Sequence, residues 1–217
     1  MRLNGGQPTP VNAQVAKNRL AGRHPPSWAL FFAVMLIVLA GDLITKSLAF
    51  EHVAAQPVVL DASSSGDLSV PPHDPISLVP YVLSLKLTIN TGAVFGQGKG
   101  LQVLFMVVSV VAAIVVIKVF ASSDAGAYLT HVSLALIMAG ALGNLHDRIQ
   151  FNAVRDLLWL FPDLTLPFGL QWPGGRKDLY PWIFNVADVA LVVGVVLMLI
   201  IIWRGPKGAP ANQTDPD

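Results

Sequence analysis

The 217-residue sequence contains no cysteine, only one glutamate, Glu51, and few charged residues of any kind. Without cysteine, the chain has no disulfide, thiolate nucleophile, iron–sulfur cluster or thiolate zinc site. Charged residues make up 12% of the sequence, against roughly 25% in soluble domains, and 53% of the residues are hydrophobic. This composition argues against a soluble protein.

Four apolar blocks of about 17 to 22 residues recur along the chain, and each is long enough to cross a hydrocarbon layer roughly 30 Å thick. We expect them to form transmembrane helices over residues 28–50, 101–120, 128–145 and 182–203. The expected fold class is therefore a membrane all-α protein, a four-helix transmembrane bundle with a small extracytoplasmic β element.

The segments outside these blocks define the expected domain organisation. Residues 1–27 hold four basic and no acidic residues and little apolar material, and we expect a disordered cytoplasmic tail. The first block is longer than the core of a signal peptide, which indicates an uncleaved anchor. A single domain would cover residues 28–203, and residues 204–217 would form a second cytoplasmic tail. Four spans place both termini on one side, and the basic leading tail favours the cytoplasm.

The long connections are expected on the outer side. Residues 51–80 combine proline breaks and a serine run with no Lys or Arg, which is typical of a flexible insertion. From Tyr81 to Asn90, apolar residues then occupy alternate positions, which predicts a strand with one apolar face.

Polar residues at membrane level are expected near the outer surface. Asp42 and Lys46 share a face of the first span, in its outer half. The outer ends of the third and fourth spans carry the others, namely Asn144, Asp147, Arg148, Asn185 and Asp188. The inner halves of the spans are almost purely apolar. Because a transporter needs polar groups at the midplane, this pattern favours an enzyme or a binding protein at the outer interface.

Several of these polar residues also have a purely structural interpretation. Asp42 and Lys46 could form a helix-stabilising ion pair, Asp147 could be part of an interfacial anchor, and Asn185 could cap the fourth helix. Asp188 lies within an apolar helix with no basic residue three or four positions away, so a functional role is favoured. The five histidines show no paired metal-binding spacing, and we expect no metal and no cofactor.

Four sequence blocks, taken together and in this order, resemble lipoprotein signal peptidase, also called signal peptidase II. The blocks are DLITK at residues 42–46, NTGAVF at 90–95, AGALGNLHDR at 139–148 and FNVAD at 184–188. The similarity extends over about residues 28–203 and leaves out both tails. No single block is specific, but the ordered set on a four-span frame is.

The resemblance implies a membrane aspartic endopeptidase of the bacterial cytoplasmic (inner) membrane, with its active site near the outer face. The family removes the signal peptide of prolipoproteins, cutting just before the cysteine that carries diacylglycerol. Its catalytic pair would correspond to Asp156 and Asp188. Substrate-binding positions would be Asp42, Lys46, Asn90, Asn144, Asp147, Arg148 and Asn185. The expected partners are the prolipoprotein and membrane lipids, with no nucleic acid, and we expect a monomer.

The chain departs from the family pattern around the first catalytic position. Arg155 and Leu157 flank Asp156, where the family usually has an apolar residue and Phe. The stretch between the two catalytic positions is longer than usual, and it contains Asp163 and Asp178 as alternatives for the first position. Spacing from the third span favours Asp156. The insertion after the first span is also long.

Arg155 is the sharpest of these departures. A guanidinium beside Asp156 would lower the pKa of that carboxyl and hinder the sharing of one proton by two carboxylates. If residues 153–158 are extended, the two neighbouring side chains face opposite sides. We therefore expect Arg155 to point toward lipid headgroups or solvent.

Two other functions remain open. Asp42 and Asp188 could be relay groups of a small proton-coupled or lipid-handling membrane protein. Polar residues in the inner halves of the spans would favour this function, but such residues are nearly absent. A non-catalytic protein with a degenerate peptidase fold would lack a catalytic aspartate, yet both candidates are present. The motifs Gly-x-Ser-x-Gly and His-Glu-x-x-His of serine and zinc peptidases are missing.

Overall fold

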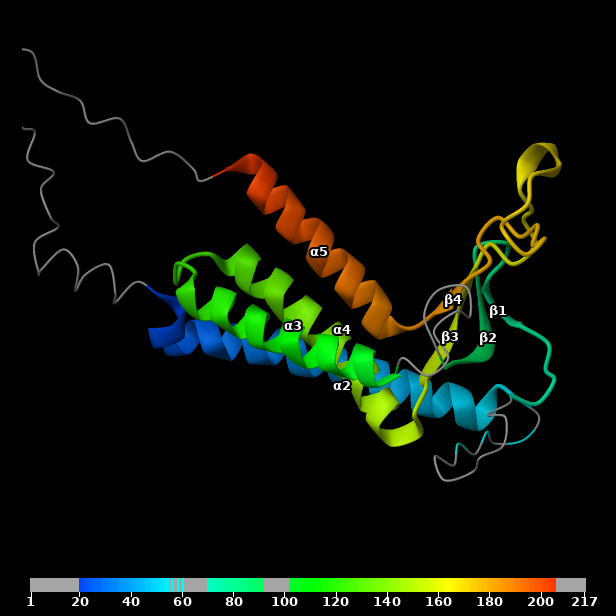
Figure 1. The fold of residues 1–217 in the computed structure, drawn as a ribbon, viewed down its shortest axis with the longest axis horizontal. Coiled ribbons are helices and arrows are strands. Elements are labelled where there is room, and N and C mark those ends of the chain that lie inside the picture. Colours follow the sequence, from blue (N-terminus) through cyan, green and yellow to red (C-terminus); the bar gives the residue numbers. More distant parts are fainter. Residues whose placement is uncertain are drawn as a thin grey trace, which may run out of the picture.

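The computed structural model describes residues 20–54, 56, 58, 60, 70–91 and 102–205. Within them the chain forms four long apolar helices and a small antiparallel sheet at one end of the helices (Figure 1). Each of the four helices is long and apolar enough to cross a membrane. Most of both predicted tails, at residues 1–19 and 206–217, and the middle of the predicted insertion, at 61–69, lie outside the described residues.

The helices confirm the four predicted spans, with different ends. They are α2 (Pro25–His52), α3 (Gln102–Ser122), α4 (Tyr128–Phe151) and α5 (Val186–Arg204). Helix α2 begins before the predicted residue 28 because Pro25 and Pro26 occupy its first turn, where proline is well tolerated. Before it, η1 (Ala21–Arg23) packs beneath the α3–α4 connection, with the Ala21 amide donating to the Ser123 carbonyl at 2.9 Å. The part of the predicted tail that the structure describes is therefore folded.

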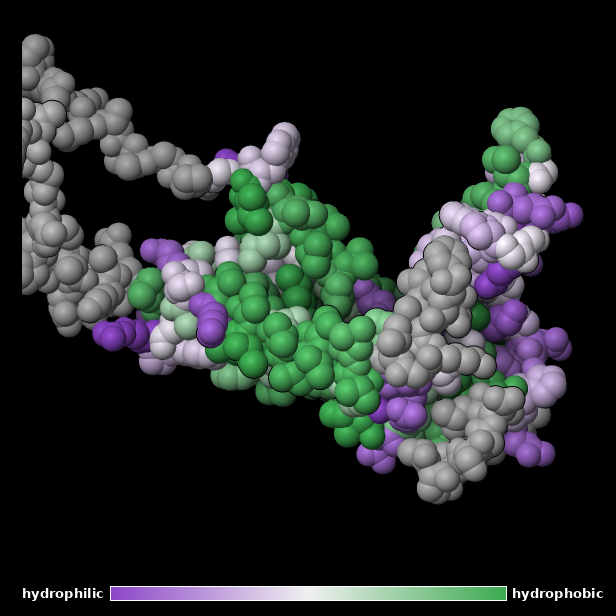
Figure 2. Space-filling view, viewed as in Figure 1, coloured by the Kyte–Doolittle hydropathy of each residue, from purple (hydrophilic) through white to green (hydrophobic). Residues whose placement is uncertain are grey.

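Helix α4 is the central helix. It packs against α2, α3 and α5, and more than half of its apolar window is buried. The other three helices leave most of their apolar windows exposed, and Figure 2 shows hydrophobic side chains along α3 and α5. In water this surface would be costly, whereas a bilayer covers it without loss.

Helices α4 and α5 approach closely through glycines. A Cβ at Gly143 of α4 would lie 2.5 Å from Asp42 Oδ2 and 3.1 Å from the Ala187 Cβ of α5. A Cβ at Gly194 of α5 would lie 2.7 Å from the Ser133 carbonyl oxygen. Small residues at such positions let two helix backbones come together inside a membrane. This close approach brings the beginning of α5 beside the polar end of α4.

The sheet has four antiparallel strands in chain order. They are β1 (Ile76–Val79), β2 (Leu83–Asn90), β3 (Val154–Leu160) and β4 (Ile183–Phe184). Strand β2 confirms the strand predicted from alternation, although an irregularity between Leu85 and Thr88 interrupts its register with β3. Strand β4 is made of residues that sequence analysis assigned to the fourth span, so α5 begins later than predicted.

The inner face of the sheet packs on the end of α2. Leu87 and Leu157 join Phe50 in a buried cluster. Described parts of the predicted insertion belong to it as well: Val58 and Val70 pack on this cluster, and the Leu87 amide donates to His73 Nε2 at 2.9 Å. Strand β1 also pairs with β2. Residues 70–79 of the predicted insertion are therefore packed on the sheet or belong to it.

Between β3 and β4 the chain forms an arm, residues 161–182, that stands away from the sheet (Figure 1). Its two sides are joined by backbone hydrogen bonds from Leu166 to Lys177 at 2.8 Å and from Leu179 to Leu164 at 2.7 Å. A short 3-10 helix, η3 (Pro167–Gly169), forms its free end. The arm accounts for the unusual length between the two catalytic positions proposed from sequence.

Candidate active site

All nine predicted site residues join one network of hydrogen bonds and ion pairs at the sheet end of the helices. The members are Asp42, Lys46, Asn90, Asn144, Asp147, Arg148, Asp156, Asn185 and Asp188. They come from α2, β2, α4, β3 and the beginning of α5. Residues that are far apart in the chain therefore meet where the sheet joins the helices.

The beginning of α5 organises the network. Asn185 is the N-cap, and its Oδ1 accepts from the Asp188 amide at 3.0 Å, while Asp188 Oδ2 accepts from the Asn185 amide at 3.2 Å. The Ala187 amide donates to Asp42 Oδ1 at 2.8 Å. A helix leaves its first N–H groups without partners in the helix, and side-chain oxygens satisfy them here. The capping interpretation of Asn185 is therefore correct, and it places the same residue in the site.

Two asparagine amides link the carboxylates of Asp156 and Asp188. Asn185 Nδ2 donates to Asp156 Oδ1 at 2.7 Å, and Asn144 Nδ2 donates to Asp188 Oδ1 at 2.7 Å. Asn144 Oδ1 accepts from Asn185 Nδ2 at 3.1 Å, which connects the two halves. Asn90 Nδ2 donates to the other oxygen of Asp156 at 3.3 Å. Both carboxylates are thus held by neutral donors on adjacent elements.

Asp156 is almost fully buried, with 3% of its surface exposed. Burial, followed by the negative charge of Asp188, raises the pKa of Asp156 to about 7. The hydrogen bonds from Asn185 and Asn90 and the charge of Lys46 oppose this rise without cancelling it. A carboxyl group with such a pKa can hold or release a proton near neutral pH, as acid–base chemistry requires.

Four buried charged residues adjoin the carboxylates of Asp156 and Asp188. We call Asp42, Lys46, Asp147 and Arg155 the charged tetrad. Lys46 Nζ lies 2.8 Å from Asp42 Oδ2, as an ion pair rather than an aligned hydrogen bond, and 3.3 Å from Asp147 Oδ2. Arg155 Nη2 donates to Asp147 Oδ1 at 2.8 Å. With two cations and two carboxylates, the tetrad is balanced, which a cluster withdrawn from water requires.

The expectation that Arg155 points to headgroups or solvent is wrong. Arg155 is 6% exposed, and its guanidinium donates a hydrogen bond to Asp147. The guanidinium carbon lies 4.6 Å from the centre of the Phe151 ring. The alternation itself is as predicted, because Asp156 faces Asn185 while Arg155 faces the opposite side of β3. The end of α4 brings Asp147 under the strand, and its carboxylate attracts the guanidinium more strongly than solvent would.

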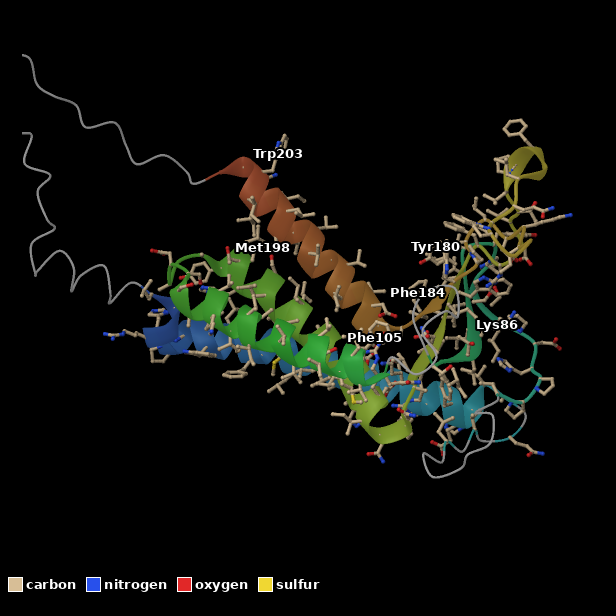
Figure 3. The ribbon with its side chains drawn as sticks, in the orientation of Figure 1. Lys86, Phe105, Tyr180, Phe184, Met198 and Trp203 are labelled. Atoms are coloured by element: carbon tan, nitrogen blue, oxygen red, sulfur yellow. The ribbon has the colours of Figure 1, made fainter. Side chains whose placement is uncertain are left out.

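Tyr180, at the root of the arm, was missed by sequence analysis. Its ring lies 6.0 Å from that of Phe184, and both lie beside the junction of the sheet with α5 (Figure 3). Burial, followed by the charge of Asp188, raises the pKa of the Tyr180 phenol. The phenol is therefore close enough to sense Asp188, although no spacing in the sequence connects the two.

The family model described as "Signal peptidase (SPase) II" matches residues 34–204 of this chain. The chain belongs to the signal peptidase II family. Among curated relatives, the lipoprotein signal peptidase of Halothermothrix orenii is 29% identical over 178 residues, which cover 82% of this chain and 98% of the relative. That of Latilactobacillus sakei subsp. sakei is 30% identical over 178 residues, with 82% and 96% coverage.

Two solved structures have the same fold. Each is titled as a bacterial membrane enzyme. The first has a TM-score of 0.59 at 22% identity and covers 82% of this chain and 93% of its own. The second has a TM-score of 0.58 at 23% identity, with 81% and 94% coverage.

Membership of the signal peptidase II family confirms the predicted function class. The protein is a membrane hydrolase, an aspartic peptidase that removes signal peptides from prolipoproteins. Of the blocks that carried the resemblance, residues 92–95 lie outside the described residues, while the other three blocks line the network.

Within this family frame, the two alternative acids lie away from the network. Asp163 and Asp178 both belong to the arm, which projects from the sheet (Figure 1). Asp178 pairs with Arg176 at 3.3 Å in an exposed contact. Of the acids Asp156, Asp163 and Asp178, Asp156 is the one that joins the network.

Proposed function

We propose that Asp156 and Asp188 are the catalytic pair of this peptidase and that it cuts just before the diacylglyceryl-modified cysteine of the prolipoprotein. The observation that carries the proposal is the contact of Asn185 with both carboxylates, through its side chain to Asp156 and through the capping box to Asp188. Two carboxylates joined in this way, one of them with a pKa near 7, can share a single proton.

A shared proton is sufficient for peptide hydrolysis without a nucleophilic side chain. The ionised member of the pair takes a proton from water as the water oxygen attacks the scissile carbonyl carbon. The protonated member donates its proton to the carbonyl oxygen. When the tetrahedral intermediate collapses, the carbon–nitrogen bond breaks and the leaving amine receives the proton taken from water. As the carbonyl reforms, a hydroxyl of the intermediate returns its proton to the carboxylate that had donated one. The pair returns to its starting protonation, and its two carboxyls titrate as a unit.

Arg148 is the proposed donor to the substrate. Its guanidinium donates to the Asn144 carbonyl at 3.3 Å and lies over the Phe105 ring at 5.4 Å, beside the start of α3 (Figure 3). From this position a cation can stabilise negative charge that develops on a substrate oxygen. For Asn90 and Asn144 the proposed role is different: Asn90 orients the carboxylate of Asp156, and Asn144 orients that of Asp188.

For three of the predicted substrate-binding residues we propose a positioning role instead. Asp42, Lys46 and Asp147 are completely buried and are held by one another, by Arg155 and by the Ala187 amide. A substrate would have to break these buried ion pairs to reach them, which is costly. They fix the relative positions of α2, α4, β3 and α5.

We also propose that the sheet end faces the outside of the bacterial cytoplasmic membrane, with both termini in the cytoplasm. Arg23 and Arg204 lie at the opposite end of the helices, in agreement with the preference of basic residues for the cytoplasmic side. In this orientation water reaches the carboxylates from outside while both acyl chains of the substrate stay in lipid. Because a single chain supplies the whole network, the protein would act as a monomer.

The test is cleavage of a purified diacylglyceryl-modified prolipoprotein by protein reconstituted in lipid. D156N and D188N should each lower turnover by at least about 100-fold, because either change removes one member of the acid–base pair. D178N is the matched control, since it removes a half-buried acid of the arm that lies outside the network, and it should keep full activity.

Two results would contradict parts of the proposal. Full turnover by D156N or D188N, with an unfolding midpoint like that of the parent, would exclude the catalytic pair. Equal cleavage of the same precursor without diacylglycerol would leave the pair in place but refute the proposed substrate preference.

A further inference from the structure

The arm carries three exposed apolar side chains, and two of them, Phe168 and Leu170, lie at its free end. Leu164 is 41% exposed, Leu170 is 58% exposed and Phe168 is 97% exposed. Figure 2 shows this end as a hydrophobic cap on an otherwise hydrophilic arm. Clusters of exposed apolar residues mark surfaces that contact a partner or a membrane. We call Phe168 and Leu170 the apolar tip.

The backbone of the arm holds the apolar tip in place. Besides the backbone bonds between its two sides, Trp172 receives a bond at its carbonyl from Gly175 at 3.0 Å, and its Nε1 donates to the Asp178 carbonyl at 3.0 Å. Phe168 has a φ of 58°, in the left-handed region that bulky residues rarely adopt. Its side chain is therefore presented outward by a specific turn, at a conformational cost that a contact made by the ring would offset.

The root of the arm lies next to the lipid-facing helix α5. Strand β4 ends at Phe184, and α5 starts immediately after its cap. Apolar side chains of α5 are exposed along the helix, among them Val192, Leu199 and Ile202. In Figure 1 the arm and α5 diverge from this junction, α5 back along the other helices and the arm away from them. Lipid that covers the first turns of α5 would therefore meet the root of the arm.

The composition of the arm matches the layers of a bilayer surface. Behind the apolar tip, Trp172, Trp182 and Tyr180 form an aromatic group with ring centres 4.7 and 5.3 Å apart. Trp and Tyr are enriched at the membrane–water interface. Arg176 and Lys177 are exposed beside them, and such side chains can reach lipid phosphates.

We propose that the apolar tip inserts into the lipid leaflet at the sheet end, beside α5, with Phe168 as its deepest residue. The arm holds two basic and two acidic residues, so its charges cancel. The arm would therefore enter the lipid through the burial of its apolar tip and not through attraction to anionic lipid. Such a contact would hold the sheet at a fixed height above the bilayer. The inference is independent of which aspartates are catalytic.

The absence of cysteine allows a direct test, because a nitroxide label can be attached at one introduced position. F168C would be labelled, reconstituted into phosphatidylcholine nanodiscs, and examined by electron paramagnetic resonance for collisions with oxygen and with a water-soluble nickel chelate. D74C, at an exposed position before β1, supplies the aqueous reference, and V192C on α5 supplies the lipid reference.

At Phe168 we expect an oxygen-to-nickel collision ratio at least about threefold above that at Asp74 and similar to that at Val192. Replacing a third of the lipid with phosphatidylglycerol should leave the ratio unchanged. L170C provides a second position for the same measurement if F168C does not fold. The label position lies outside the network, so labelled protein should retain prolipoprotein cleavage.

Two outcomes would overturn the inference. A ratio at both Phe168 and Leu170 equal to that at Asp74 would show that the apolar tip stands in water. A ratio that rises only after addition of the lipid-modified precursor would show that the apolar tip binds the substrate protein and not the bilayer.

Discussion

Replacing Arg155 with valine removes one cation from the charged tetrad and leaves the opposite face of β3, which carries Asp156, unchanged. The variant loses the bonds of Nη2 and Nε to Asp147, at 2.8 and 3.3 Å. Asp147 keeps Lys46 at 3.3 Å and the backbone amide of residue 155 at 3.0 Å. The buried carboxylate is weakened in its pairing but not left without a cation.

The expected loss of stability follows from this partial compensation. Removing one partner of a buried ion pair costs about 3 to 5 kcal/mol. Because Asp147 retains Lys46, we expect R155V to lower the free energy of unfolding by an amount near the lower limit, about 3 kcal/mol, or roughly a hundredfold in the unfolding equilibrium. R155K should fall between R155V and the parent, because lysine restores the charge without the two-pronged contact.

Activity should change far less than stability. The Arg155 guanidinium faces Asp147, while Asp156 faces Asn185 and Asn90. Under conditions where the variant is folded, we expect a change in turnover below about threefold and a shift of the acidic limb of the pH–rate profile below about half a unit.

The assay combines denaturant unfolding in detergent with precursor cleavage at a temperature where all variants are folded. The double variant R155V/D147N tests the origin of the loss. With the carboxylate neutralised, it should be more stable than the sum of the single changes by at least about 1 kcal/mol. Unchanged stability of R155V would refute the balanced tetrad. A hundredfold loss of turnover, or an acidic limb moved by a full unit, would refute the separation of the two faces.

Three further predictions concern the pair, the helix contact and the insertion. Because burial and Asp188 raise the pKa of Asp156 to about 7, its contribution to stability is complete at low pH and is lost as pH rises from about 4 to about 7. Unfolding of D156N should therefore depend less on pH over this range than that of the parent, and turnover of the parent should fall as pH rises through about 7, as a pH–rate profile would show. G143A should lower both stability and turnover because its Cβ would lie 2.5 Å from Asp42 Oδ2, whereas G41A, with nothing within 4 Å, should not; equal unfolding midpoints would contradict the close packing. Replacing residues 61–69 with a Gly/Ser linker should leave substantial cleavage, whereas replacing 70–79 should lower it because β1 and the His73–Leu87 hydrogen bond are lost. Replacement of the whole of 51–80, which the sequence alone indicated to be a flexible insertion, should therefore also lower cleavage in the same assay.

Patterns along the chain were sufficient to predict the helices and the strand β2, whereas the place of Asp156 in the network was implied only by the family resemblance. Hydropathy reports whether a segment can lie in lipid, and each of the four helices meets that condition. It cannot distinguish Ile183 and Phe184 in a two-residue strand from the first turn of an apolar helix, because both are apolar. The fourth span was therefore predicted to begin too early.

Contacts between elements were beyond the reach of sequence patterns. Whether Arg155 meets solvent or Asp147 depends on how the end of α4 passes beneath β3, and no periodicity reports that crossing. A charge count gives no hint, because Arg148 directly follows Asp147 and already supplies a second cation beside Lys46.

The charged tetrad also connects the two proposed catalytic positions through the backbone. Arg155 directly precedes Asp156, and at the other end of the tetrad Asp42 accepts from the amide of Ala187, which directly precedes Asp188. The contacts run from Arg155 to Asp147, Lys46 and Asp42, so that each end is anchored one residue from a catalytic carboxylate.

Side chains of adjacent residues in β3 point to opposite faces, so the tetrad can fix this backbone without contacting the substrate. Of the four charges of the tetrad, that of Lys46 lowers the pKa of Asp156, but burial and the charge of Asp188 outweigh it and hold this pKa near 7. Under the proposed mechanism, Arg155 therefore leaves proton sharing undisturbed, because its charge is matched by Asp147 at a distance of 2.8 Å.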